Sequence, residues 1–169
     1  MEVSIRILSP EVFEKYGRVV KVPRDPTKAF VSAEYFDFWR TSTQFHIEGG
    51  RVEIGVCTVR ARDYTLPVME RHLKTPEIFV PVGKDLIFAV APSRDLTDPQ
   101  DEPRAEDIEA FYLKKDEMII LGKGIWHYAP FTTKGDREAS ALVFFKAETP
   151  NADCVFAKIK GDEEVLLVS

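Results

Sequence analysis

The sequence predicts a mainly β protein, a sandwich or barrel of short strands, with one short helix near the N-terminus. Apolar segments rich in Val, Ile, Phe and Tyr recur along the chain, and turns containing Gly, Pro, Asp or Asn separate them. Short strands at this spacing are typical of all-β sandwiches and barrels. Residues typical of the two ends of a helix occur together near the N-terminus. Ser9 as N-cap, Pro10 in the first turn and Gly17 as the stop predict a helix over residues 10–16.

Strand-like patterns begin with "VSIRIL" and continue through most of the chain. The later segments are Val19–Val22, Phe30–Trp39, Arg51–Arg62, Tyr64–His72, Ile78–Val82, Leu86–Ala91, Ile108–Leu113, Met118–Leu121, Ala139–Lys146, Cys154–Ile159 and Val165–Val168. The most polar stretch, Ser93–Asp107, has six acidic residues and two prolines. It predicts a solvated loop, and the alternative is a mobile cover over a site.

The composition indicates one ordinary globular domain over residues 1–169, with 44% hydrophobic and 30% charged residues. A net charge of −5 gives no sign of a nucleic-acid partner. No run approaches the ~18 apolar residues of a membrane span, so no membrane partner is expected. The N-terminus has no signal-peptide pattern. Cys57 and Cys154 lie far apart and are expected to be reduced thiols, so we expect a cytoplasmic location.

The stretch "MERHLKTPEIFVPVGKD" places two carboxylates and an imidazole beside a strongly apolar run. If residues 68–72 form a strand, Glu70 and His72 share one face. A hairpin turn at "LKTP" would then bring Glu77 level with them. Buried carboxylates are costly unless something pairs with them. An imidazole and two carboxylates that converge inside a barrel suit a divalent transition metal.

Together with the downstream segment "LGKGIWHYAPF", this stretch resembles the two metal motifs of the cupin superfamily, His-x-His…Glu…Gly and Pro-x-Gly-x-x-His. The matching residues are His72, Glu77 and Gly83 in the first motif and Gly124 and His127 in the second. Glu70 stands in the place of the first histidine, and Gly122 replaces the proline. Glycines at this turn allow positive φ, so the turn can aim the next strand inward.

We therefore predict His72, Glu77 and His127 as metal ligands. Glu70 is either a fourth ligand or the general base. Nickel, manganese, iron and zinc are not distinguished, and a metal-free site in which Glu70 bonds to one of the histidines stays open. A further alternative is that both histidines are purely structural. His46 has no partner at ligand spacing and is expected to be structural or on the surface.

Most of the chain resembles the ureidoglycolate lyases, long called ureidoglycolate hydrolases. The segments that carry the resemblance are "LSPEVFEKYGRVV", Arg60–Ala61 before Leu66–Pro67, "ERH" at Glu70–His72, "FVP" at Phe79–Pro81, "GIWH" at Gly124–His127 and "ADC" at Ala152–Cys154. The resemblance implies a cupin-type (RmlC-like jelly-roll) β-barrel, a homodimer, and cleavage of ureidoglycolate to glyoxylate and urea in allantoin breakdown. It also implies a metal cofactor, described as nickel in family members.

The chain departs from the family near the second motif. Leu121–Gly122 replace a Tyr-His pair, and Tyr128 and Ala129 intervene before Pro130 where the family continues His-Pro. The alternative is therefore a cupin that acts on, or merely binds, another small hydroxy acid or sugar acid.

The carboxylate of such a substrate needs a cation. Arg60 is the predicted partner, because the alternate residues from Val52 to Arg60 share one face and their apolar members are expected to face the core. Further candidates for substrate contacts are Lys84, Lys123, Trp126 and Tyr128. Arg71 points away from this face by parity. The apolar C-terminal run "EEVLLVS" is expected to form an exposed strand edge that pairs with a second copy.

Overall fold

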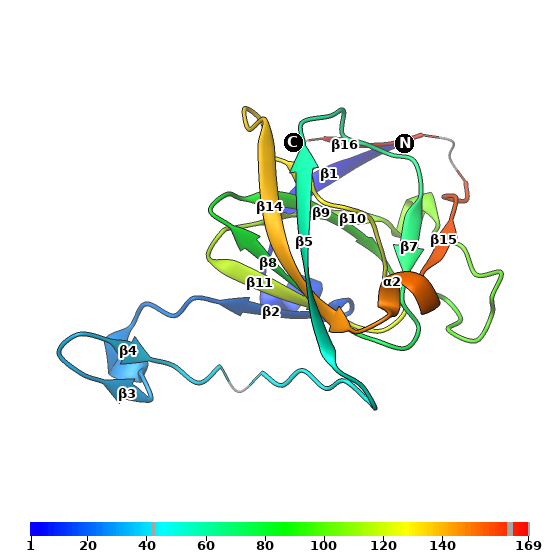
Figure 1. The fold of residues 1–169 in the computed structure, drawn as a ribbon. Coiled ribbons are helices and arrows are strands. Elements are labelled where there is room, and N and C mark those ends of the chain that lie inside the picture. Colours follow the sequence, from blue (N-terminus) through cyan, green and yellow to red (C-terminus); the bar gives the residue numbers. More distant parts are fainter. Residues whose placement is uncertain (42, 162–163, 169) are drawn as a thin grey trace.

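The computed structural model describes residues 1–41, 43–161 and 164–168. Two large β-sheets curve around a shared apolar interior and form an open half-barrel, from which a long arm projects (Figure 1). This arrangement confirms the predicted mainly β fold. Within the described residues, none of the helices has the length and apolar character that crossing a membrane requires.

The larger sheet carries most of the site. Its strands in spatial order are β15 (Val155–Ala157), β7 (Met69–Arg71), β12 (Trp126–His127), β9 (Leu86–Ala91), β10 (Glu109–Leu113), β1 (Glu2–Ile7), β16 (Val165–Val168) and β6 (Thr65–Leu66), and β13 (Phe131–Thr132) also pairs with β9. Every residue of β9 is buried, which agrees with its unbroken apolar sequence.

The smaller sheet faces it. Its strands in spatial order are β2 (Gly17–Lys21), β11 (Glu117–Leu121), β8 (Glu77–Val82), β14 (Glu138–Lys146) and β5 (Val52–Arg60). Alternate residues of β8 are buried, so Glu77 and Phe79 point into the half-barrel. Strand β5 pairs with β14 along its whole length and ends the sheet on that side.

The predicted parity of β5 is wrong. Val52, Ile54 and Val56 are 53%, 60% and 70% exposed, whereas Val59 is buried. The strand is apolar on both faces, and the face with the smaller side chains lies inside. The alternation of apolar residues therefore did not identify the core-facing side.

The C-terminal run is not a free edge either. β16 pairs with β1 on one side and with β6 on the other, and Val165 and Leu167 are buried. Glu163 and Ser169, which belong to the same run, lie outside the described residues.

The helices are short. They are α1 (Pro10–Phe13) and α2 (Thr149–Ala152), with 3-10 turns η1 (Pro26–Lys28) and η2 (Ala105–Asp107). Ser9 caps α1 as predicted, because its side chain accepts a hydrogen bond from the Val12 amide. The helix stops three residues earlier than predicted, since the Tyr16 amide bonds to the Phe13 carbonyl in a tighter turn. Helix α2 was not predicted.

The arm contains the two-stranded sheet of β3 (Val31–Ser32) and β4 (Asp37–Phe38). The sequence predicted one strand across this segment, and residues 33–36 instead turn the chain back. Figure 1 shows β3 and β4 well outside the half-barrel.

Gly17 lies where β2 passes close to the end of β11, ahead of the turn that leads to His127. Its φ is +153°, and a Cβ built there would lie 1.8 Å from the Ile120 carbonyl oxygen. Gly135 also has positive φ, +94°, but a Cβ there meets nothing within 4 Å.

We therefore expect Gly17→Ala to lower the free energy of unfolding by about 2–3 kcal/mol more than Gly135→Ala does. The strain of positive φ is common to both variants, so the difference isolates the clash. Guanidinium denaturation measures it, and equal losses would contradict the close approach.

Candidate functional site

A cavity of about 210 Å³ lies between the two sheets, beside the edge strand β5. The lining residues come from both sheets and are Gly55, Val56, Cys57, Glu70, Glu77, Phe79, His127, Tyr128, Ala129, Val143 and Phe145. It is mostly apolar, with a few polar groups gathered at one place, as ligand sites commonly are.

Strand pairing gathers these polar groups. β12 pairs with β7 so that His127 stands opposite Glu70, and His72 follows at the end of β7. Glu77 reaches the same point from β8 on the opposing sheet. The Gly124 amide donates to the His72 carbonyl oxygen at 2.7 Å, and the positive φ of Gly124, +74°, matches the predicted glycine turn. The structure therefore brings the four predicted residues together.

Glu77 lies between the two histidines. Its Oε1 is 3.5 Å from His72 Nε2 and its Oε2 is 3.2 Å from His127 Nε2. Glu70 stands farther off, with Oε1 3.9 Å from His127 Nε2. The side chains of Glu77 and both histidines are at most 8% exposed, whereas that of Glu70 is 24% exposed. Glu77 is thus enclosed, and Glu70 borders the cavity.

Backbone carbonyls orient both imidazole rings. His72 Nδ1 donates to the Asp153 carbonyl at 2.7 Å, and His127 Nδ1 donates to the Ile125 carbonyl at 2.9 Å. The Nε2 atom of each ring is thereby directed toward Glu77. In metal sites, such bonds on the distal ring nitrogen fix the tautomer that ligates.

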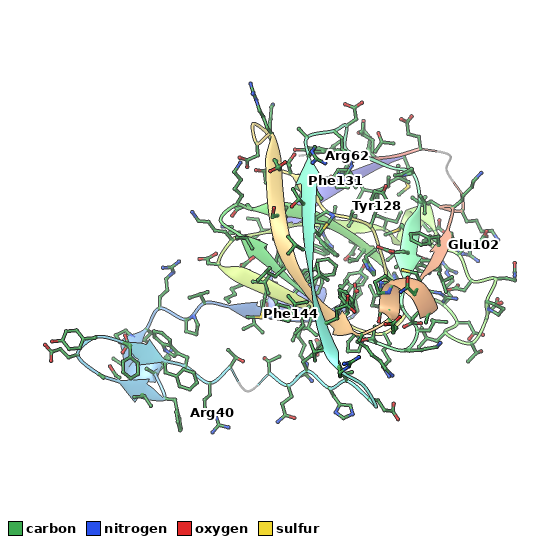
Figure 2. All side chains as sticks on the ribbon, viewed as in Figure 1. Arg40, Arg62, Glu102, Tyr128, Phe131 and Phe144 are labelled. Atoms are coloured by element: carbon green, nitrogen blue, oxygen red, sulfur yellow. The ribbon has the colours of Figure 1, made fainter. Side chains whose placement is uncertain are left out.

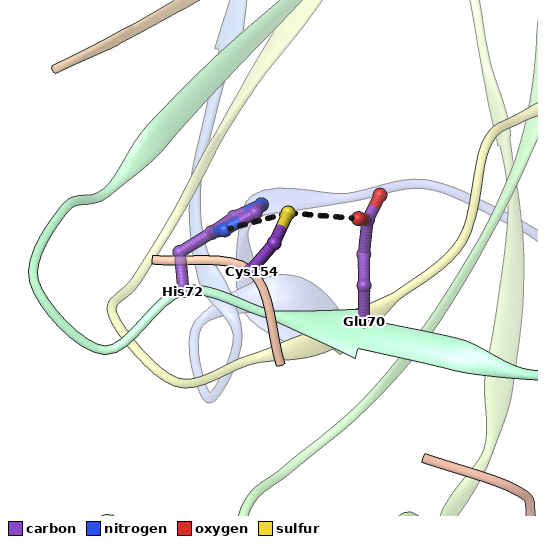
Figure 3. Close-up of side chains that lie close together, drawn as sticks. All are labelled: Glu70, His72 and Cys154. Carbon is purple, nitrogen blue, oxygen red and sulfur yellow. Dashed lines mark hydrogen bonds between the residues drawn. The ribbon is translucent and has the colours of Figure 1, made fainter. Parts of the chain in front are cut away.

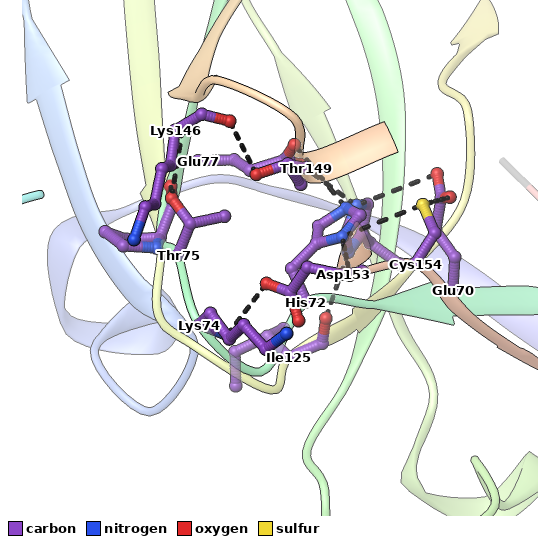
Figure 4. A network of polar contacts seen from close by, with 12 residues as sticks. Glu70, His72, Lys74, Thr75, Glu77, Ile125, Lys146, Thr149, Asp153 and Cys154 are labelled. Atoms are coloured by element: carbon purple, nitrogen blue, oxygen red, sulfur yellow. Dashed lines mark hydrogen bonds and ion pairs between the residues drawn. The ribbon is translucent and has the colours of Figure 1, made fainter. Parts of the chain in front are cut away.

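Asp153 holds His72 in two further ways. Its carboxylate accepts hydrogen bonds from the Leu73 and Lys74 amides at 3.0 and 2.8 Å, which secures the chain just after His72 (Figure 4). Asp153 was not predicted, and no local signal in the sequence indicates a contact between residues so far apart.

The pKa values show how strongly these groups interact. Burial alone would lower the pKa of His72, but the adjacent Glu77 carboxylate outweighs it and raises that pKa to about 9. Burial alone would raise the pKa of Glu77, but the imidazoles of His127 and His72 lower it to about 2. Without a metal, a protonated His72 therefore faces an ionised Glu77 at neutral pH.

These residues meet the requirements of a divalent transition metal. His72, Glu77 and His127 each offer one ligand atom, and the three atoms lie within 4.8 Å of one another. His127 Nε2 is buried and has no hydrogen-bond partner among the described residues, although a Glu77 oxygen is 3.2 Å away. A buried polar atom of this kind is costly unless it binds something. The mixed nitrogen and oxygen donors suit such ions.

A second trio, Glu70, His72 and Cys154, also lies within this range (Figure 3). The Cys154 thiol donates to Glu70 Oε2 at 3.4 Å. Its sulfur is 3.8 Å from His72 Nδ1, which already donates to the Asp153 carbonyl. Burial and the Glu70 charge raise the pKa of Cys154 to about 12. Because His72 Nδ1 donates to the Asp153 carbonyl, the His72 nitrogen beside the sulfur has no lone pair for a metal, and the first trio is the better metal site.

A buried ion pair on the opposite face supports the strands that carry the ligands. Arg71 is fully buried, and its Nη1 is 2.8 Å from Asp101 Oδ2, which also accepts from Trp126 Nε1 at 3.3 Å. The Arg71 guanidinium lies 4.7 Å from the Trp126 ring centroid. Because Arg71 adjoins Glu70 and His72, and Trp126 adjoins His127, this cluster couples β7 to β12.

Arg71 also fastens the acidic segment. It donates to Ser93 Oγ, to the Asp95 carbonyl and to the Asp98 carbonyl, at 3.0, 3.2 and 2.7 Å. Ser93 in turn donates to the Gly124 carbonyl. The segment therefore packs behind the ligand strands, on the face away from the cavity, and it does not cover the site.

Among the predicted substrate contacts, only Tyr128 lines the cavity. Arg60 has a side chain 80% exposed, 3.8 Å from Glu138, and Lys84 pairs with Asp136 at 2.9 Å. Lys123 is exposed, and Trp126 is fully buried against Arg71. Arg60 points outward because β5 presents its other face to the cavity.

Arg62 was missed. Its Nη2 donates to the carbonyls of Ala129 and Pro130 at 2.9 and 3.2 Å, and its guanidinium lies 4.0 Å from the Phe131 ring centroid and 5.6 Å from that of Tyr128 (Figure 2). Because Tyr128 and Ala129 line the cavity, this cation stands at its border. A correct assignment of the two faces of β5 would still not have identified Arg62, because this residue lies beyond the end of the strand.

Comparison with known proteins places this chain in a family. The family model for ureidoglycolate lyase matches residues 1–165. A ureidoglycolate lyase from Azotobacter vinelandii is 25% identical over 171 residues, which cover 98% of this chain and 96% of that protein.

Two similar solved structures share less sequence with this chain. Oxalate decarboxylase OxdC from Bacillus subtilis matches with a TM-score of 0.41 and 14% identity, over 82% of this chain and 37% of that one. RmlC from Streptococcus suis, in complex with dTDP-D-xylose, matches with a TM-score of 0.36 and 9% identity, over 70% and 62%. The chain thus spans less than two thirds of either protein, and these similarities carry no argument about activity.

The His72–Glu77 pair predicts how stability depends on pH. The pKa of His72 is raised from 6.5 to about 9, so its contribution in the metal-free protein is fully present below pH 6.5 and is lost as pH rises through 9. We expect the free energy of unfolding, measured with guanidinium after chelation, to fall over this range. His72→Gln should remove this pH dependence. A wild-type protein equally stable at pH 6.5 and 9 would contradict the pairing.

Asp101→Asn tests whether the buried Arg71–Asp101 pair supports strands β7 and β12. It leaves the buried Arg71 charge without its carboxylate, so we expect a loss of about 3–5 kcal/mol in the free energy of unfolding. Asp107→Asn is the matched control, because it breaks the exposed Arg94–Asp107 pair, which contributes little to stability. Metal titration should show that Asp101→Asn also weakens binding by about 10–100-fold. Equal behaviour of the two variants would rule out the supporting role.

Proposed function

Because the chain belongs to the ureidoglycolate lyase family, we propose that it cleaves ureidoglycolate to glyoxylate and urea in the cavity beside β5. The observation that carries this proposal is the buried trio of His72, Glu77 and His127 with Glu70 next to it. A cytoplasmic location and a homodimer, both expected from the sequence, belong to the same proposal.

The substrate has a carboxylate, a hydroxyl and a ureido group on one carbon. When the hydroxyl loses its proton, its oxygen electrons form the carbonyl of glyoxylate, and the C–N bond breaks. The C–N electron pair stays on the ureido nitrogen, which takes up a proton and leaves as urea. One group that first accepts and then returns this proton is sufficient.

His72, Glu77 and His127 would hold a divalent metal, whose identity among nickel, manganese, iron and zinc stays open. When bound, it would supply Lewis-acid chemistry that lowers the pKa of the substrate hydroxyl. Glu77 is suited to ligation and not to proton transfer, because it is enclosed and each of its oxygens faces the Nε2 atom of one histidine.

Glu70 is suited to proton transfer. It borders the cavity and is partly exposed. Its Oε1 lies 3.9 Å from His127 Nε2, farther than either Glu77 oxygen lies from its histidine. The Cys154 thiol donates to its Oε2, which holds one oxygen and leaves Oε1 on the side of His127. We therefore assign Glu70 as the general base that receives the hydroxyl proton and returns it to the leaving nitrogen.

The substrate carboxylate needs a cation, and the described cavity lining contains neither Lys nor Arg. Arg62 stands nearest to that lining by its contacts with Tyr128 and Ala129, and its remaining N–H groups are available for a carboxylate. The geometry therefore favours Arg62 over Arg60, whose side chain extends toward Glu138.

The variants Glu70→Gln and Glu77→Gln distinguish the general base from the metal ligand. We expect Glu70→Gln to keep its metal and to lose about 10²–10⁴-fold in kcat, because only proton transfer is removed. Glu77→Gln should lose metal and activity together. Elemental analysis and urea release from racemic ureidoglycolate measure both effects. If both variants lose the metal, Glu70 is a ligand. If the wild type holds metal but releases no urea, the substrate is wrong.

Arg62→Ala compared with Arg60→Ala tests the carboxylate contact. Loss of a hydrogen bond to a charged group costs about 1.5–3 kcal/mol, so Arg62→Ala should lower kcat/KM on the order of 10–100-fold with metal content unchanged. Arg60→Ala should change kcat/KM less than about threefold, since an exposed ion pair contributes little. The reverse order would restore Arg60 as the substrate contact.

A further inference from the structure

The arm, defined here as residues 25–41 and 43–47, is anchored to the body at its two ends. Arg24 pairs with Asp116 at 2.8 Å on one side, and Lys146 Nζ donates to the Glu48 carbonyl at 2.9 Å on the other. Between these points, the hydrogen bonds of the described arm residues join them to one another. Figure 1 shows the arm projecting from the half-barrel. A two-stranded hairpin alone is marginally stable in water, so this arm needs a surface to pack on.

The arm is also strongly apolar. Its exposed large side chains are Phe30, Val31, Tyr35, Phe36 and Phe38, with exposed fractions of 64%, 40%, 88%, 59% and 53%. An aromatic side chain covers roughly 150–250 Å², so four rings at this exposure present on the order of 500 Å² of apolar surface per copy. Patches of this size mark interaction sites in proteins that are otherwise polar outside.

The body of the same chain carries a matching surface. The outer face of β5 exposes Val52, Ile54 and Val56, and the strand is nine residues long. Since β5 ends its sheet, the backbone groups along its free side have no strand partner among the described residues. Long apolar edges of this kind recruit another chain.

This edge also borders the cavity. Gly55, Val56 and Cys57 of β5 form one wall, and β7 and β12 of the other sheet contribute Glu70 and His127 across from it. A segment that lies along β5 would therefore cover the open side of the cavity.

We propose that the arm of a second copy of this chain docks along the outer face and free edge of β5 and covers the mouth of the cavity. Two copies related by a two-fold axis bury both arms and both β5 faces in one contact, which brings the buried area near the ~1,200–2,000 Å² of stable interfaces. The inference rests on the proposed homodimer and is independent of which substrate is cleaved.

Three variants test the docking by sedimentation velocity over a range of protein concentrations. Phe36→Asp/Phe38→Asp alters the arm, Ile54→Asp alters the β5 face, and Ile7→Asp is the matched control, because Ile7 is 75% exposed on β1. We expect a wild-type dimer, and dissociation constants raised on the order of 10–100-fold by the arm and β5 variants but not by the control. Circular dichroism checks that each variant stays folded.

The rate at which iodoacetamide alkylates Cys57, read by peptide mass spectrometry, tests the cover over the cavity. Cys57 lines the cavity beside β5, so loss of the partner's arm should raise its rate at least several-fold. Neither readout requires ureidoglycolate, so a failed activity assay leaves this test intact. A monomeric wild type, or a dimer that both variants preserve, overturns the docking. Dissociation without faster Cys57 alkylation overturns the cover.

Discussion

The carboxylate of Glu77 is enclosed in the half-barrel between two imidazoles, and the arrangement of the site follows from the need to compensate its charge. In the metal-free protein, the proton on His72 does so, at a pKa raised to about 9. A divalent cation would take the place of that proton and would also bind His127 Nε2. Because the Nδ1 atoms of both histidines donate to backbone carbonyls, the rings are oriented before any cation arrives.

Each ligand is fixed by contacts distant in the chain. Asp153 bonds to His72 and to the two amides that follow it, whereas the Arg71–Asp101 pair and the Trp126 ring couple the strands from behind. The acidic segment that Arg71 fastens thus serves the site from the opposite face. One face of the strands carries the candidate site, and the contacts on the other face hold the strands together.

The sequence predicted the site better than it predicted the edge of the sheet. Strand parity and a predicted hairpin are local, and they placed Glu70, His72 and Glu77 together. His127 was added through the resemblance to the cupin motifs. Parity failed at β5 because both of its faces are apolar, and the choice between them depends on packing that no local pattern contains. Contacts such as His72 with Asp153, 81 residues apart, come from the tertiary fold alone.

We propose that His72, Glu77 and His127 together hold a divalent metal. Anomalous scattering from crystals of untagged protein, recorded at the absorption edge of the metal that elemental analysis finds, tests it most directly. We expect one peak, at about 2.0–2.2 Å from Nε2 of both histidines and from a Glu77 oxygen. A peak within the trio of Glu70, His72 and Cys154, or the absence of any peak from this cavity, would contradict it.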